Sequence, residues 1–224
     1  ENEGDLAALL SWCGERRIAR RVLGRGTNLL VSDLGVRGVT VELTGPGFAE
    51  MREQDNEVVA GAAVPLPALM GRLERCGLAG LEVLEGIPGA IGGALYMNAG
   101  TRGGTLLERV NWIRCLNPAG ETCIFHNKEL AAGYRCCTSL AGHVVIEVSL
   151  RVDKATPETV RRGRGDAARD RAWRPSRPSA GSVFKNPPGD YAGRLAESAG
   201  LKGFAVGGAA VAAAHANVIE TRSG

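Results

Sequence analysis

Residues 85–100 read EGIPGAIGGALYMNAG, and this stretch is the most informative in the chain. Glycines at this density allow backbone N–H groups to approach a bound anion and to form concave nests. The apolar residues between them predict that the stretch packs against other parts of the chain, because an ordinary surface loop would be polar. Its five glycines are Gly86, Gly89, Gly92, Gly93 and Gly100, and they surround Pro88 and Asn98.

A second glycine segment, GRGTNLL at residues 24–30, follows a predicted strand and leads into no obvious long helix. It lacks the third glycine of the dinucleotide fingerprint and the lysine of a phosphate-binding P-loop. A tight turn between strands explains this segment equally well. Two glycine loops in one chain would nevertheless suit a ligand that carries two phosphates.

A third segment, SAGSVFKNP at residues 179–187, places a hydroxyl, a cation and an amide close together in Ser182, Lys185 and Asn186. No GxSxG motif surrounds Ser182, and no Ser-His-Asp arrangement can be assembled around it, so a hydrolase nucleophile is not indicated. A serine in a dry, oriented environment can donate a proton. The alternative is a turn serine that caps backbone amides.

The bulk properties are those of an ordinary globular protein. At 224 residues the chain can bury one large core or two modest ones, and 44% of its residues are hydrophobic and 23% charged. The net charge of +3 requires no polyanionic partner. We find no apolar run of about 18 residues, no signal peptide and no CxxC pair. These features predict a cytoplasmic protein with reduced thiols, no membrane span and no metal site.

Hydrophobic spacing and turn residues predict a strand-rich α+β chain. The composition changes near residue 154, which predicts two lobes. We expect helices over residues 5–16, 65–76, 156–173 and 189–200, and strands over residues 21–23, 39–43, 57–61, 144–152 and 217–220, with a hairpin formed by residues 110–116 and 121–125 around NPAG.

Four motifs in order carry a resemblance: GRGTNLLVSD (24–33), GLEVLEGIPGAIGGALYMNAG (80–100), GYR (133–135) and PSAGSVFKNPPGDYAGRLAESAGLKGFAVGGAAV (178–211). The chain resembles the UDP-N-acetylenolpyruvoylglucosamine reductase family, in its shorter form without a tyrosine-bearing insertion. The resemblance implies the vanillyl-alcohol-oxidase-like flavoprotein fold. It implies a two-part FAD-binding domain at residues 1–153, with lobes of about 1–45 and 46–153. A smaller α+β substrate-binding domain is implied at residues 154–224.

The resemblance also implies which residues bind the cofactor. FAD is expected to be noncovalent, since neither glycine loop contains a histidine. The expected FAD-binding residues are Gly24, Arg25, Gly26, Thr27, Asn28 and Leu29 in the first loop, and Gly86, Ile87, Pro88, Gly89, Gly92, Gly93, Asn98, Ala99 and Gly100 in the second.

The implied reaction is the NADPH-dependent, FAD-mediated reduction of UDP-N-acetylglucosamine enolpyruvate to UDP-N-acetylmuramate in peptidoglycan synthesis. Arg135 matches the family arginine that stabilises negative charge developing next to the substrate carboxylate, and Ser182 matches the proton donor. The resemblance places Tyr134, Lys185, Asn186 and His215 near the substrate. Arg135 could instead be a surface arginine, and His215 a core histidine.

Family members extend beyond both ends of this stretch and carry a catalytic glutamate after the HAN segment, so we expect a chain truncated at both ends. This keeps open a catalytically incomplete flavin-binding remnant, and an oxidase on the same flavin fold is a further alternative. Seven arginines between Arg161 and Arg177 could suggest a nucleic-acid patch, but a charge-rich helix is usually a solvated face. We expect a monomer that binds neither nucleic acid nor membrane.

Overall fold

The computed structural model describes residues 2–101, 103–169, 171 and 177–222. It divides into two compact units, which are considered separately below. The first unit comprises Glu1–Arg25 and Val36–Ala168, and the second comprises Gly26–Gly35 and Arg169–Gly224. The functional domains expected at residues 1–153 and 154–224 divide the chain differently, and that division stays a prediction.

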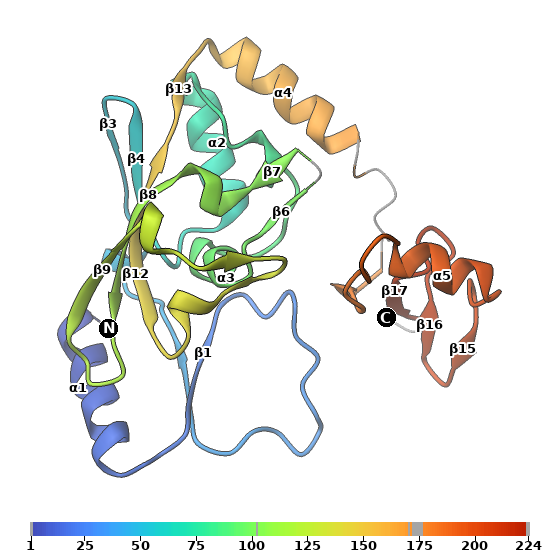
Figure 1. Ribbon diagram of the computed structural model, residues 1–224, viewed down its shortest axis with the longest axis horizontal. Helices are drawn as coiled ribbons and strands as arrows, with labels where there is room; N and C mark the ends of the chain where they lie inside the picture. The colour runs from blue at the N-terminus through green and yellow to red at the C-terminus, as the bar shows by residue number, and fades with distance from the viewer. Residues whose placement is uncertain (1, 102, 170, 172–176, 223–224) are drawn as a thin grey trace. The chain divides into compact units, whose positions relative to one another are not determined.

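An antiparallel five-stranded sheet forms the centre of the first unit (Figure 1). The strongest hydrophobic strand of the sequence, β12, lies in the middle of it and is buried on both faces. The hairpin expected around NPAG is confirmed as β8 and β9, whose turn closes with a bond from the Asn117 N–H to the Glu121 carbonyl. In order across the sheet the strands are β3 (Met51–Gln54), β4 (Glu57–Gly61), β12 (Val144–Arg151), β8 (Val110–Leu116) and β9 (Thr122–His126).

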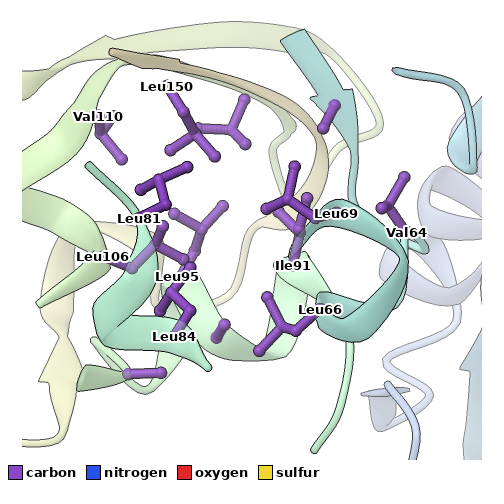
Figure 2. Packing of buried hydrophobic residues seen from close by; sticks show 14 of the residues in the cluster. Val64, Leu66, Leu69, Leu81, Leu84, Ile91, Leu95, Leu106, Val110 and Leu150 are labelled. Carbon is purple, nitrogen blue, oxygen red and sulfur yellow. The ribbon is translucent and has the colours of Figure 1, made fainter. Parts of the chain in front are cut away.

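The larger core of the first unit lies between this sheet and two helices, α2 (Leu66–Cys76) and α3 (Ile91–Tyr96). Helix α2 begins directly after Pro65 and ends at Gly77, whose φ of +63° is the left-handed conformation that closes many helices. Figure 2 shows Leu66 and Leu69 of α2 beside Ile91 of α3 in this apolar interior. The core therefore fixes the position of the glycine-rich stretch.

A smaller core covers the other face of the sheet, where α1 (Glu3–Glu15) packs. Alternate residues of a strand point to opposite faces, so Ile146 of β12 joins this cluster while Val145 joins the larger one. Helix α1 contributes Leu6 and Leu10, and its start is closed by a capping box. The amphipathic helix expected near the start of the chain is thus confirmed.

Helix α4 (Pro157–Arg169) ends the first unit. Its side chains explain part of the arginine-rich composition, because Arg161 pairs with Glu74, and Arg164 pairs with both Glu74 and Glu85. These arginines are held in ion pairs and are not presented as an open basic face. The helix was expected over residues 156–173. Residues 170, 172 and 173 of that range lie outside the described residues.

The second unit contains a four-stranded antiparallel sheet and the short helix α5 (Ala192–Ser198). The helix ends shortly before Gly200, which has a φ of +72°, as the sequence predicts. The sheet order is β14 (Ser179–Ser182), β17 (Val218–Thr221), β16 (Ala209–Val211) and β15 (Ala205–Val206).

Residues 85–100 contain helix α3, which is not among the helices expected from the sequence. Gly92 and Gly93 are poor helix formers, but the N–H groups of Ile91 and Gly92 donate to the carbonyls of Val64 and Ala62. Contacts with the segment between β4 and α2 thus begin the helix. Four further pairs complete the first unit: parallel β1 (Arg20–Leu23) with β2 (Val39–Glu42), and antiparallel β5 (Leu78–Ala79) with β13 (Asp153–Lys154), β6 (Gly100–Thr101) with β7 (Gly104–Thr105), and β10 (Ala132–Gly133) with β11 (Cys136–Cys137).

Candidate active site

Backbone conformation or packing explains some of the glycines in residues 85–100, but not Gly93. Gly86 and Gly89 have φ of +65° and +120°, which side chains disfavour. A Cβ at Gly92 would lie 3.1 Å from the Ala62 Cβ, so this glycine permits close packing against the sheet. At Gly93 a Cβ would meet no atom of the described residues within 4 Å, and the position is exposed. Neither backbone conformation nor packing requires this glycine, so it fits a cradle against which a ligand lies.

The loop at residues 24–30 shows the same open character. Ideal Cβ atoms at Gly24 and Gly26 would meet nothing within 4 Å in the described part of the chain. Gly26 has a φ of +67°, and its carbonyl accepts a bond from the Leu29 N–H. Gly24 and Arg25 belong to the first unit, whereas Gly26, Thr27, Asn28 and Leu29 belong to the second.

The second unit brings the end of this loop beside the serine strand. A Cβ built at Gly181 would lie 4.0 Å from Asn28 Oδ1, although the two residues are far apart in sequence. Asn28 was expected to bind the cofactor, and Ser182 was expected to act on the substrate. The structure therefore places an expected cofactor residue next to the strand that carries the expected proton donor.

Asn98 combines four unusual features. The residue is buried, with 7% of its surface exposed, and its φ of +41° is left-handed. Its Nδ2 donates to the Gly133 carbonyl at 3.1 Å, which joins residues 85–100 to the GYR segment. Its Oδ1 is fully buried and meets no hydrogen-bond donor among the described residues. A buried acceptor without a donor costs stability, so Asn98 fits a position that contacts a bound group.

Tyr134 and Arg135 form the two-residue turn of the β10–β11 hairpin, since Gly133 pairs with Cys136. Arg135 has a φ of +57°, a conformation that costs any residue with a side chain more than it costs glycine. Its guanidinium lies 5.5 Å from the Tyr134 ring centre. No carboxylate of the described residues pairs with it. Arg135 is therefore available to bind an external anion.

Ser182 is exposed at the end of β14, opposite Val218 of β17, with a register irregularity between Ser179 and Ser182. Asn217, buried at 4% exposure, holds the backbone that follows. Its carbonyl accepts from the Val183 N–H at 2.9 Å, its Oδ1 accepts from the Phe184 N–H at 2.8 Å, and its Nδ2 donates to the Phe184 carbonyl at 2.8 Å. Sequence reasoning did not select Asn217, although it lies in the quoted HAN segment.

The other expected substrate residues have mixed environments. Lys185 is exposed, whereas Asn186 Oδ1 accepts from the Ala192 N–H at the start of α5, which is a capping role. His215 Nδ1 accepts from the Asn217 N–H, and its ring packs so closely on α5 that a Cβ at Gly193 would lie 2.8 Å from its Cε1. Burial lowers the pKa of His215 below its ordinary value, and the Lys202 ammonium acts in the same direction.

Within the first unit the structure thus links Asn98 to the turn that carries Arg135. Within the second unit it brings Asn28 beside Gly181, the neighbour of Ser182, while His215 packs against α5. Within residues 2–101, 103–169, 171 and 177–222, no three His, Cys, Asp or Glu side chains gather in a group that could hold a metal ion. The same residues form no helix long and apolar enough to cross a membrane.

Comparisons with known proteins identify the family. Residues 1–125 match the FAD binding domain family, and residues 174–224 match the UDP-N-acetylenolpyruvoylglucosamine reductase C-terminal domain. The UDP-N-acetylenolpyruvoylglucosamine reductase of Heliobacterium modesticaldum is 39% identical over 227 residues, which cover 100% of this chain and 72% of that protein. This chain belongs to the UDP-N-acetylenolpyruvoylglucosamine reductase family. It is an FAD-dependent oxidoreductase, as the four motifs imply.

Further relatives agree with this assignment. The reductase of Geobacter sulfurreducens is 41% identical and covers 98% of this chain and 73% of its own length. The crystal structure of UDP-N-acetylenolpyruvylglucosamine reductase from Thermus caldophilus superposes with a TM-score of 0.88 at 36% identity, covering 100% of this chain and 80% of that one. A solvent-stable cholesterol oxidase reaches a TM-score of 0.54 at 16% identity, over 67% of this chain and 33% of its own, and shows likeness of fold alone. The expected α+β flavoprotein fold is confirmed.

The described residues fit FAD. In the first unit Gly24 and Gly93 leave open space beside the backbone, and the left-handed Gly86 and Gly89 allow N–H groups to point outward. Asn98 Oδ1 adds a buried acceptor for an N–H or O–H donor. These properties suit a ligand that has both a diphosphate and hydrogen-bond donors.

Proposed function

We propose that this chain reduces UDP-N-acetylglucosamine enolpyruvate to UDP-N-acetylmuramate in peptidoglycan synthesis, with NADPH as hydride donor and FAD bound noncovalently. Among the geometric features, Arg135 carries the proposal. Its guanidinium lacks a carboxylate partner in the described part of the chain and is held on a left-handed turn residue. The substrate supplies a carboxylate that would pair with it.

Arg135 would bind the substrate carboxylate through the two parallel N–H donors of its guanidinium. When bound, FAD supplies the hydride chemistry that links the nicotinamide to the enolpyruvyl group. Hydride addition at the terminal vinyl carbon moves the double-bond electron pair to the neighbouring carbon, which bears the carboxylate. Fixed positive charge at Arg135 favours that redistribution without reorganisation. The two-residue turn, closed by the Gly133–Cys136 pair, sets the position of the Arg135 backbone.

Ser182 would complete the reaction by giving its hydroxyl proton to the carbon that has gained the electron pair. The product then has a methyl group and one new C–H bond, and solvent returns a proton to the serine oxygen. The Asn217 bonds to Phe184 support this role, because they fix the backbone directly after Ser182. Tyr134, Lys185, Asn186 and His215 would contact the remainder of the substrate.

We also propose that residues 1–153 form the FAD-binding domain, with lobes of about 1–45 and 46–153, and that residues 154–224 bind the nucleotide sugar. A monomer in the cytoplasm, independent of nucleic acid and membrane, completes the proposal. The family membership supports these points, and gel filtration of the FAD-loaded chain would measure the oligomeric state.

The test separates the two halves of the reaction under anaerobic conditions. We expect NADPH to bleach the visible flavin absorbance of the wild-type chain, and the enolpyruvyl substrate to restore it. Ser182→Ala should be bleached at the wild-type rate, but its recovery should be slower by about 10²–10⁴-fold. Ser179→Ala, at the other end of the same strand, is the matched control and should recover normally.

Three results would count against the proposal. Failure of NADPH to bleach the wild-type chain excludes the nicotinamide as donor, and bleaching without recovery on substrate indicates a flavin-binding remnant. Rapid recovery with oxygen in place of substrate indicates an oxidase. Recovery of Ser182→Ala at the wild-type rate would remove Ser182 from the mechanism and leave the reductase assignment in place.

A further inference from the structure

The side-chain amide of Asn98 joins two loops that lie 35 residues apart in sequence. Asn98 lies two residues after α3, near the end of the stretch of residues 85–100, and its Nδ2 donates to the Gly133 carbonyl at 3.1 Å. Gly133 is the residue that pairs with Cys136 to close the turn carrying Arg135. A shift of the Gly133 carbonyl would therefore shift the Arg135 Cα.

The chemistry of the contact fixes the orientation of the amide. A carbonyl only accepts hydrogen bonds, so the Asn98 atom facing Gly133 must be the NH₂ group, and rotation of the amide would bring two acceptors together. The buried atom left without a donor in the described residues is consequently Oδ1. Whatever contacts that atom in the working protein must present an N–H or an O–H.

We propose that Asn98 is a positioning residue that couples the flavin nucleotide to the turn of Arg135. Its Oδ1 accepts a hydrogen bond from an N–H or O–H of bound FAD, and its Nδ2 holds the Gly133 carbonyl. FAD thereby fixes the amide and, through it, the place of the arginine. The identification of FAD as the ligand rests on the family membership, and the consequence for turnover rests on the proposed function.

A purely local explanation also exists, because asparagine is tolerated in the left-handed conformation that Asn98 adopts, with its φ of +41°. Asn98→Gly separates the two explanations. Glycine adopts this backbone conformation easily, so the variant keeps the turn and removes both hydrogen bonds. If the asparagine serves the backbone alone, Asn98→Gly will behave like the wild type.

The experiment measures amide hydrogen exchange of peptides covering residues 131–138, with and without FAD, and the dissociation constant of FAD from fluorescence quenching. Addition of FAD should slow exchange in these peptides of the wild-type chain. In Asn98→Gly we expect FAD to bind roughly tenfold more weakly, about the effect of one lost hydrogen bond. At saturating FAD the protection of residues 131–138 should be lost.

Asn127→Ala is the matched control. Asn127 also donates its Nδ2 to a backbone carbonyl, that of Leu107 at 2.8 Å, and it lies outside the expected FAD-binding residues. Its loss should leave FAD affinity and FAD-dependent protection unchanged. The measurement uses FAD alone, so it gives an answer whether or not the chain reduces the enolpyruvyl substrate.

A second measurement, of kcat, tests whether the coupling affects turnover. Asn98→Gly should lower kcat in the wild-type background but have little further effect in Arg135→Ala, while still weakening FAD binding in both. Equal protection of residues 131–138 by FAD in the wild type and in Asn98→Gly would overturn the coupling and leave the proposed function intact. Absence of FAD binding to the wild-type chain would overturn both.

Discussion

Replacement of Gly93 by alanine tests the flavin cradle most directly. Gly93 lies in the first turn of α3, where an added Cβ meets no described atom within 4 Å. Its neighbour Gly92 differs, because a Cβ there would lie 3.1 Å from the Ala62 Cβ and 3.3 Å from the Ala62 oxygen. The same chemical change at adjacent residues should therefore have opposite consequences.

The expected free energies follow from this geometry. Alanine is a better helix former than glycine by about 0.5–1 kcal/mol, so Gly93→Ala should raise the free energy of unfolding of the FAD-free chain by up to that amount. At Gly92 the same gain is opposed by overpacking, which costs about 1–3 kcal/mol. Gly92→Ala should therefore be destabilised. Urea unfolding of the two FAD-free variants measures both effects.

FAD affinity should rank the two variants in the opposite order to stability. Gly93→Ala, the more stable variant, should bind FAD more weakly. If FAD lies against Gly93, the new methyl group occupies its space, and the dissociation constant should rise at least about tenfold, equivalent to 1.4 kcal/mol. Gly47→Ala is the control, because a Cβ at Gly47 also meets no described atom within 4 Å and this residue lies outside the glycine loops. Wild-type FAD affinity in Gly93→Ala, measured by flavin fluorescence, would refute the cradle.

Three further predictions concern single side chains. Arg135→Gly should raise the thermal midpoint of unfolding, because glycine relieves a φ of +57°, and it should abolish substrate-dependent reoxidation of the flavin. Asp55→Gly is the control: its φ is +51°, so it should also raise the thermal midpoint, without affecting turnover. Arg164→Ala should lower the urea unfolding free energy by about 1–2 kcal/mol, because part-buried Glu85 loses its ion-pair partner and Glu74 keeps only Arg161; exposed Arg162→Ala should change it by less than about 0.5 kcal/mol. Because folding lowers the His215 pKa, the unfolded chain binds that proton more readily, so stability should decrease as the pH falls below about 6.5. The thermal midpoint of unfolding should depend less on pH in His215→Asn than in the wild type. An unchanged pH dependence would contradict this origin.

The elements that sequence predicted best are those whose own residues determine them. Helix α2 has apolar residues at helical spacing between a proline and a left-handed glycine, and β12 is a long apolar strand. Helix α3 was missed because its start depends on carbonyls of Val64 and Ala62, which no local pattern reveals. The parallel pairing of β1 with β2 was also beyond prediction, since the chain between them has no regular structure that signals a crossover.

The candidate site shows the same division. Glycine density, the GYR motif and the serine loop led to the prediction of cofactor and substrate residues, which stays a prediction. The left-handed backbone of Arg135 belongs to a local hairpin turn, whereas the hydrogen bond from Asn98 to Gly133 depends on contact between distant segments. Asn217 was overlooked for that reason, because its importance appears only when its side chain meets Phe184 across two strands. Residue type suggested the chemistry, and tertiary contacts supplied the positioning.

Fold alone cannot choose between a reductase and an oxidase, because the chain shares its fold with a cholesterol oxidase at 16% identity. The choice depends on side chains whose placement the fold does not require. Arg114 and Arg164 each contact two glutamates and thereby stabilise the first unit. Arg135 has no such partner among the described residues and sits where glycine would be more stable. The backbone cost at Arg135 and its lack of an ion pair in the described part of the chain support the proposal that it binds an anionic ligand, namely a substrate carboxylate beside a developing negative charge.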